Sequence, residues 1–421
     1  MKRLSAAILA IAAFIAATAQ TTREEVYADL NKAGGVYYAY PVTESSNTPA
    51  PKGYKPFYIS HYGRHGSRYL ISDKDYRRVI ETLDGANRAG ALTPLGEDVL
   101  ARLERIWPEA EGRGGDLTPL GARQHNAIAT RMYRSFPEVF TPKSEITAQS
   151  TTVLRCALSM AAFCEGLKEQ NPQLRISRES SDRYMHYLNY HSPESNRFTA
   201  PDGPWREEYR KFEESHTRPD RLVSSLVKDP EYIRRHINPG ELMWGLYWIA
   251  VDMQNMESPE RFYDIFEKDE LFDLWQCVNY RFYVCDSNYK LNNGMMLDNA
   301  KPQLRNIVET ADSYISGDKR GASLRFGHDG NLIPLAGVMG LKDCYNSVEN
   351  PDDFYKAFSD FKLAPMAGNI QMVFFRNKAG DVIVKFMHNE RETSIPVETD
   401  IYPFYHWGDV RAYYLGLLGE E

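Results

Sequence analysis

Three short apolar runs with the pattern of strands lie far apart in this 421-residue chain. Each is followed by polar or charged residues and then by a helical pattern. The runs and the residues behind them are Phe57–Ser60 before Arg64-His65-Gly66-Ser67-Arg68, Ser144–Ser150 before Arg155, and Ala322–Phe326 before His328-Asp329. Strands that alternate with helices indicate an α/β sheet. In open sheets of this class the carboxyl ends of the strands meet at the ligand crevice. We therefore expect the three junctions to lie together.

Helix-start signals lie between these runs. Leu92-Thr93-Pro94-Leu95-Gly96 recurs as Leu117-Thr118-Pro119-Leu120-Gly121. In each copy the threonine suits the N-cap of a helix and the proline suits its first turn. Thr151 or Thr152 is expected to cap a further helix, from Val153 to Lys168, that is apolar nearly all round and therefore buried.

The rest of the chain divides into a core and an insert. Ile370–Arg376 and Val382–His388 alternate in polarity and are joined by a turn, which predicts a hairpin. From about 175 to 310, aromatic and charged residues are frequent and helical spacing dominates. We predict an α/β fold with a mixed, mostly parallel sheet flanked by helices, built from residues 20–174 and 311–421. A mostly helical insert, 175–310, would shape the substrate pocket.

The first residues have the pattern of a secretory signal. Lys2 and Arg3 precede the apolar run Ala6–Ala16, and Ala17-Thr18-Ala19 fits a small-x-small cleavage site. The run is too short to span a membrane comfortably, which disfavours the alternative of a membrane anchor. We expect residues 1–19 to be removed and the protein to be exported, either to a periplasm or to the medium, without membrane attachment.

Charge and cysteine content narrow the function further. The formal net charge is −7, so no general basic field attracts nucleic acid, and an anionic substrate would need a local basic pocket. Five cysteines leave two alternatives open, disulfides between distant cysteines or buried free thiols. Cys156 and Cys164 are too far apart along one helix to pair. No cysteine–histidine spacing indicates a zinc site.

The residues at the three junctions suit metal-free hydrolysis of a phosphomonoester. Arginine forks bind phosphate oxygens bidentately and keep their charge, and Arg64, Arg68 and Arg155 could supply them. A neutral imidazole can attack phosphorus and form a covalent phosphohistidine. His65 lies between two of the arginines and is the best candidate. This chemistry requires no metal or organic cofactor.

The third junction supplies the remaining parts. His328 could donate to a phosphate oxygen, and Asp329 could protonate the leaving alkoxide as a general acid. Each part has a simpler interpretation alone: Arg155 as a structural ion-pair partner, and His328-Asp329 as a turn and helix cap. Their joint occurrence at strand-to-helix junctions favours the catalytic interpretation.

These residues also carry a family resemblance. Arg64-His65-Gly66-Ser67-Arg68-Tyr69, Leu154-Arg155-Cys156-Ala157 and Phe326-Gly327-His328-Asp329 resemble the histidine acid phosphatase branch of the histidine phosphatase superfamily. Within that branch the chain looks most like multiple inositol polyphosphate phosphatases and phytases. The resemblance covers most of the chain outside the insert, and it implies the phosphoglycerate-mutase-like α/β fold.

The resemblance also implies roles for individual residues. His65 would be the nucleophile, and phosphate would be bound by Arg64, Arg68, Arg155 and His328. The inositol polyphosphate branch usually has His-Ala-Glu where this chain has His328-Asp329-Gly330, whereas His-Asp is typical of bacterial phytases and acid phosphatases. Asp329 would therefore be the proton donor, and positional preference on the inositol ring cannot be carried over.

The substrate is less constrained than the reaction. A highly phosphorylated ring would need cations beyond the catalytic pocket, and Arg183 in the polar segment Ser177–His191 is our candidate. The alternative is that this segment is simply solvated.

We expect an exported phosphomonoesterase whose partner is a small phosphorylated molecule, with phytate-like inositol polyphosphates as the first candidate substrates. The alternatives are a broad acid phosphatase acting on sugar phosphates, a mutase-type phosphotransferase and a non-catalytic phosphate-binding protein. Oligomeric state stays open.

Overall fold

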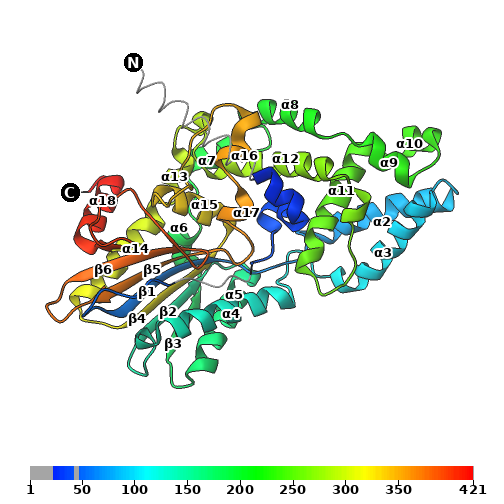
Figure 1. The fold of residues 1–421 in the computed structure, drawn as a ribbon. Coiled ribbons are helices and arrows are strands. Elements are labelled where there is room, and N and C mark those ends of the chain that lie inside the picture. Colours follow the sequence, from blue (N-terminus) through cyan, green and yellow to red (C-terminus); the bar gives the residue numbers. More distant parts are fainter. Residues whose placement is uncertain (1–21, 42–46, 421) are drawn as a thin grey trace, which may run out of the picture.

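A computed structural model describes residues 22–41 and 47–420, so the signal segment expected at 1–19 lies outside the described residues. The centre is one eight-stranded sheet with strand order β3-β2-β4-β1-β5-β6-β7, and β8 pairs with β6 (Figure 1). The strands are β1 Lys55–Arg64, β2 Glu145–Ser150, β3 Ile176–Ser180, β4 Gly321–Gly327, β5 Asn369–Arg376, β6 Val382–His388, β7 Arg391–Thr393 and β8 Phe404–His406.

The sheet is mixed, as predicted. β3, β2, β4 and β1 are parallel to one another, whereas β5 to β8 are added in antiparallel fashion. β5 and β6 form the predicted hairpin, with Ile370 opposite His388. β1 is longer than the expected Phe57–Ser60, because His61 to Arg64 still pair with β4 and β5. The Arg-His-Gly bend, which the sequence predicts to be catalytic, therefore leaves the strand only at His65.

Helices account for most of the remaining chain. The longer ones are α2 Asp73–Arg88, α3 Pro94–Ala110, α4 Pro119–Ser135, α5 Leu154–Gln170, α8 Arg206–His216, α11 Pro239–Asp252, α12 Lys268–Asp286, α14 Lys301–Ser316, α15 Asp329–Val338 and α18 Trp407–Leu418. The shorter ones are α6 Met185–Leu188, α7 Pro193–Thr199, α9 Asp220–Leu226, α10 Pro230–His236, α13 Met295–Asp298, α16 Phe354–Ala357 and α17 Asp360–Leu363. Segments of 3-10 helix are η1 Leu30–Tyr37, which is kinked at Gly35, η2 Pro137–Val139, η3 Asp182–Tyr184, η4 Met253–Asn255, η5 Tyr263–Ile265, η6 Lys290–Asn292 and η7 Pro351–Asp353.

The two faces of the sheet belong to two separate hydrophobic cores. Successive strand residues point to opposite faces, so Ile59 and Val373 join the core beneath α4 and α5. Tyr58 and Phe374 join the other core, which continues through α14, α15 and α18 into the helical part of the molecule. Helices thus cover both faces, and the carboxyl ends of the parallel strands open toward the helical part (Figure 1).

The helical part does not coincide with residues 175–310. That range begins with β3, which pairs with β2 in the sheet. In addition, α2 and α3, from the range expected in the core, pack against α11 and α9. η1 and α16 also pack against α12, so the helical part of the fold is assembled from several stretches of the chain.

The start of α5 differs from the prediction. Its N-cap is Val153, without a capping side chain, so Thr151 and Thr152 do not cap it. Thr151 is still extended beside β4: its N–H donates to the carbonyl of Phe326 and its hydroxyl contacts His328. Thr93 and Thr118 do cap α3 and α4, as predicted.

Two further expectations concern the whole chain. All five cysteines are buried and unpaired, so the free-thiol alternative holds. Across residues 22–41 and 47–420, no helix combines the length and apolar character needed to cross a membrane.

Candidate active site

The three predicted junctions meet at the carboxyl edge of the parallel strands. Arg64, the last residue of β1, pairs with Gly327, the last residue of β4. The N–H of His65 donates to the carbonyl of Gly327 at 2.9 Å. The imidazole rings of His65 and His328 lie 5.8 Å apart between centroids. Residues more than 260 positions apart in sequence are thus held together by backbone pairing.

The bend after β1 is fixed by a close approach to the start of α4. A Cβ on Gly66 would lie 2.4 Å from the carbonyl oxygen of Gly121, and a Cβ on Gly121 would lie 2.3 Å from that of Ser67. Only glycine fits at these two positions. The N–H of Thr118 donates to the same Ser67 carbonyl at 2.9 Å. The second copy of the Leu-Thr-Pro-Leu-Gly motif therefore docks on the catalytic bend.

His65 is held as a neutral imidazole with a defined tautomer. Its Nδ1 lies 2.9 Å from the carbonyl oxygen of Gly66, so Nδ1 carries the hydrogen and Nε2 keeps its lone pair. Burial, followed by the charges of Arg64, Arg68 and Arg155, holds the pKa of His65 well below its ordinary value. An unprotonated Nε2 is the state that a nucleophile requires.

Three arginines surround this histidine, and each keeps an unused donor. The buried Nε atoms of Arg64, Arg68 and Arg155 have no hydrogen-bond partner among the described residues. Arg64 is anchored by the carbonyls of Val36 and Ala364, and Arg68 lies 4.6 Å above the ring of Tyr37. Within the described residues, the one hydrogen bond of the Arg155 side chain is a 3.5 Å contact with the carbonyl of Gly115.

The third junction supplies His328 and Asp329. Nε2 of His328 lies 3.2 Å from the hydroxyl of Thr151, and burial lowers its pKa to about 4. Asp329 occupies the first turn of α15 and forms a 2.7 Å ion pair with Arg64. Burial raises the pKa of Asp329, but Arg64, His328 and Arg68 together outweigh burial and hold it below its ordinary value. The cluster therefore contains three arginines and one carboxylate. The positive charge that remains can be neutralised by a phosphate dianion.

Arg183 lies elsewhere. It is exposed on η3 and lines a cavity of about 430 Å³ that also contains Arg325 of β4. None of the six residues predicted to act on phosphate lines this cavity, which we call the Arg325 cavity. Arg183 thus remains a predicted substrate contact that the geometry does not bring to the cluster.

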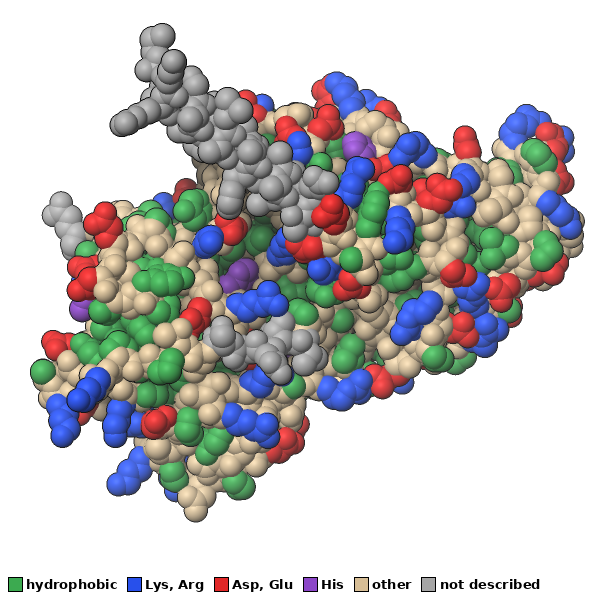
Figure 2. Space-filling view, viewed as in Figure 1, with side chains coloured by type: hydrophobic (Ala, Val, Ile, Leu, Met, Phe, Trp, Pro, Cys, Tyr) green, Lys and Arg blue, Asp and Glu red, His purple; other side chains and the backbone are tan. Residues whose placement is uncertain are grey.

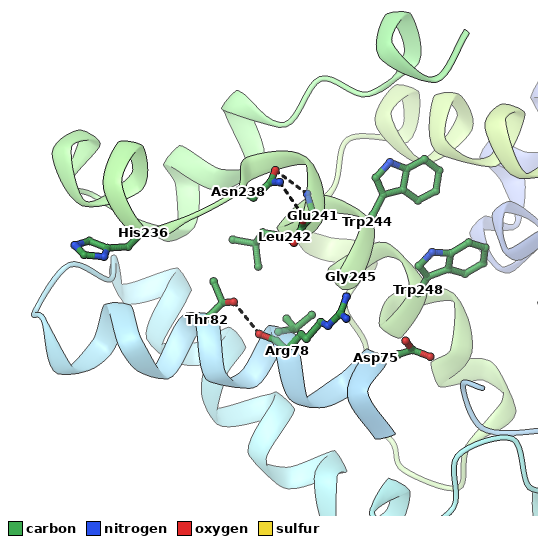
Figure 3. A pocket seen from close by; sticks show the side chains of 11 residues that line it. Asp75, Arg78, Thr82, His236, Asn238, Glu241, Leu242, Trp244, Gly245 and Trp248 are labelled. Carbon is green, nitrogen blue, oxygen red and sulfur yellow. Dashed lines mark hydrogen bonds between the residues drawn. The ribbon is translucent and has the colours of Figure 1, made fainter. Parts of the chain in front are cut away.

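Another hollow lies in the helical part, between α2 and α11. It has a volume of about 490 Å³, and Figure 3 shows Arg78 of α2 facing this hollow from one side and Trp244 and Trp248 of α11 from the other. It contains no member of the catalytic cluster. Figure 2 shows positive and negative side chains interspersed over the visible face. This mixture of charges agrees with the expectation that an anionic substrate is bound by a local basic pocket and is not attracted by a general basic field.

Several residues that hydrogen-bond to the bend after β1 belong to no recognisable sequence motif. The hydroxyl of Ser159 accepts from the N–H of Gly66 at 3.0 Å, and Gln124 accepts from the N–H of Ser67 at 2.9 Å. Ser67 also donates to Asn255 at 2.6 Å. Such contacts depend on how α5, α4 and η4 pack, so one sequence cannot reveal them. The Arg-His-Gly-Ser-Arg bend could be found because its residues are adjacent.

Comparisons with known proteins agree with this geometry. The family model described as histidine phosphatase superfamily (branch 2) matches residues 64–389. Multiple inositol polyphosphate phosphatase 1 of Gallus gallus is 23% identical over an alignment of 391 residues, and the match covers 87% of this chain and 83% of the relative.

Solved structures show the same fold. The multiple inositol polyphosphate phosphatase of Bifidobacterium longum, in complex with inositol hexasulfate, superposes with a TM-score of 0.79 at 18% identity, covering 90% of this chain and 97% of that chain. The phytase from D. castellii superposes with a TM-score of 0.63 at 15% identity, covering 93% and 88%.

Proposed function

Since the chain belongs to branch 2 of the histidine phosphatase superfamily, we propose that it is an exported phosphomonoesterase that hydrolyses phytate-like inositol polyphosphates through a phosphohistidine at His65. Phosphatase activity follows from the family. The substrate class rests on the named relatives, and export rests on the signal pattern of residues 1–19. The observation that carries the covalent step is the neutral His65, with Nε2 free among three arginines that have unused donors.

The chemistry runs in two displacements. Nε2 of His65 attacks phosphorus, the bond from phosphorus to the ester oxygen breaks, and Asp329 gives its proton to the departing alkoxide. Water then attacks the phosphohistidine, its proton passes to the Asp329 carboxylate, and the phosphorus–nitrogen bond breaks. Arg64, Arg68 and Arg155 stabilise the charge on the non-bridging oxygens in both steps.

The ion pair between Arg64 and Asp329 explains how the acid is prepared. Without substrate, Arg64 favours the ionised carboxylate. A phosphate dianion at the arginines competes for Arg64 and repels the carboxylate, which raises the pKa of Asp329. Asp329 therefore takes up a proton together with the substrate.

Turnover of two substrates tests the proposal. We expect phosphate release from phytate to exceed that from glucose 6-phosphate in kcat/KM, and His65→Ala to abolish both. Acid quenching of the wild type during turnover should trap a phosphorylated protein that His65→Ala does not form. Equal efficiency on the two substrates would favour the broad acid phosphatase, and residual turnover in His65→Ala would exclude the covalent mechanism.

A further inference from the structure

The Arg325 cavity is a second polar site on the same sheet. In the pairing of β2 with β4, Thr147 is opposite Ser323 and Gln149 is opposite Arg325, and all four line the cavity. The exposed residues Arg183 and His186 lie at its rim. Tyr62 contacts both regions: its hydroxyl accepts from the N–H of His328 at 3.3 Å and donates to the carbonyl of Leu188, in the same helix as the lining residues His186 and Tyr187, at 3.4 Å.

Arg325 is buried without a counter-ion. Only 2% of it is exposed, yet neither Arg325 nor Arg183 forms an ion pair within residues 22–41 and 47–420. Arg325 donates to neutral acceptors: Asn306 Oδ1 at 2.8 Å, Ser60 Oγ at 3.0 Å, Thr310 Oγ1 at 3.2 Å and the Ser323 carbonyl at 3.5 Å. These bonds use four of the five guanidinium N–H groups. A buried charge without a partner is costly.

The cavity lining offers no neutralising carboxylate. No aspartate or glutamate is among its lining residues. Glu179, opposite Gln149 on β3, does not line the cavity; it is exposed and accepts from the hydroxyl of Tyr184. The cavity therefore combines a buried cation, a second arginine at the rim, and the hydroxyls of Thr147 and Ser323, whereas the hydroxyl of Thr310 already donates to the carbonyl of Asn306.

We propose that the Arg325 cavity binds a free tetrahedral oxyanion, inorganic phosphate, at a site separate from the catalytic cluster. The anion neutralises Arg325 and accepts from its remaining N–H and from the hydroxyls of Thr147 and Ser323, and Arg183 contacts it from the rim. Charge-assisted bonds of this kind are the usual means of holding phosphate. The proposal does not depend on turnover, because it concerns equilibrium binding.

Equilibrium dialysis of the full chain with radiolabelled inorganic phosphate tests this site. The wild type should bind two phosphates per chain, one at the catalytic arginines and one at Arg325. Gln149→Glu has nearly the same shape but places a carboxylate opposite Arg325, so we expect the second site to weaken at least about tenfold. The control Gln173→Glu makes the same charge change at an exposed residue outside the cavity and should bind two.

A second variant keeps the test decisive if Gln149→Glu folds poorly. Thr147→Val removes one lining hydroxyl with little change of volume and should weaken the second site by about threefold to tenfold. Retained binding of one phosphate at the catalytic arginines shows that each variant is folded. A single phosphate in the wild type would overturn the proposal, as would a second phosphate that Gln149→Glu and Thr147→Val hold as tightly as Gln173→Glu does.

Discussion

Buried arginines at the ends of the strands differ from the buried arginine in the middle of a strand. Arg64, Arg68 and Arg155 follow or end strands and each keeps an Nε without a partner, whereas Nε of Arg325, within β4, is bonded to Asn306. A residue inside a strand has neighbours on both sides that can accept its hydrogens. A residue beyond the strand end faces the crevice, where a ligand must supply the acceptors. Position along a strand thus separates the arginines of the cluster, which keep Nε for a ligand, from Arg325, whose hydrogen bonds are mostly made within the protein and leave one N–H for an anion.

Among the changes that leave His65 in place, replacing the carboxylate of the cluster, Asp329, should give the largest effect. We expect Asp329→Asn to lower kcat on alkyl phosphates by about 10²–10⁴-fold, since general acid catalysis contributes that much. The loss on p-nitrophenyl phosphate should be far smaller, because nitrophenolate leaves without a proton. Steady-state kinetics on both substrates provide the measurement.

Asp286→Asn is the matched control. Oδ1 of Asp286 lies 3.2 Å from where a Cβ on Gly330 would be, and burial raises its pKa to about 7. Asp286 is thus a second acid beside α15 that is not at a strand end. We expect similar, small losses on both substrates. If the loss confined to alkyl phosphates appeared in Asp286→Asn instead, the proton donor would be Asp286.

Replacing one arginine that follows a strand, Arg155, and the arginine within a strand, Arg325, tests whether the two positions differ in function. Arg155→Ala should lower kcat/KM by about 10²-fold, the scale of losing one preorganised charge donor. Its stability should change little, because its side chain makes a single 3.5 Å contact. Arg325→Met should leave kcat/KM nearly unchanged and lower the free energy of unfolding by about 1–3 kcal/mol, as it leaves buried acceptors unpaired. If Arg325→Met lost activity as Arg155→Ala does, the distinction would fail.

The acidic limb of the pH profile gives a subtler test. Only neutral His65 can attack, and its lowered pKa keeps it neutral well below pH 6.5. Arg155 is one of the charges that lower this pKa. Without it the pKa of His65 rises, so the acidic limb of kcat/KM in Arg155→Ala should move to higher pH, by up to about one unit. Arg325→Met should keep the wild-type limb. Superimposable limbs in all three proteins would show that Arg155 does not act on His65.

The same contrast explains what one sequence could reveal. Arg64, His65 and Arg68 are adjacent in sequence, and the family pattern linked them to His328, so their convergence could be predicted. Arg325 carries no local motif, because it lies within an apolar strand. The polar surroundings of Arg183 favour a substrate contact, but the path of the chain after β3 decides which cavity it lines. Thr151 and Thr152 have the residue type of a helix cap, but α5 begins at Val153 and the N–H of Thr151 pairs with Phe326 of β4.

The two copies of the Leu-Thr-Pro-Leu-Gly motif offer the smallest and most closely matched comparison. Thr93 caps α3 and donates to the carbonyl of Ser225 in the helical part, whereas Thr118 caps α4 and its hydroxyl donates to the carbonyl of Ser67 in the catalytic bend. Each threonine-to-alanine change removes one cap, so both variants should lose about 1 kcal/mol of unfolding free energy in urea titrations. Only Thr118→Ala loosens the bend that carries His65, so only that variant should also lose kcat, by a few-fold. Equal activity in the two variants would mean that the backbone bond from Thr118 to Ser67 and the glycine contacts fix the bend without the hydroxyl.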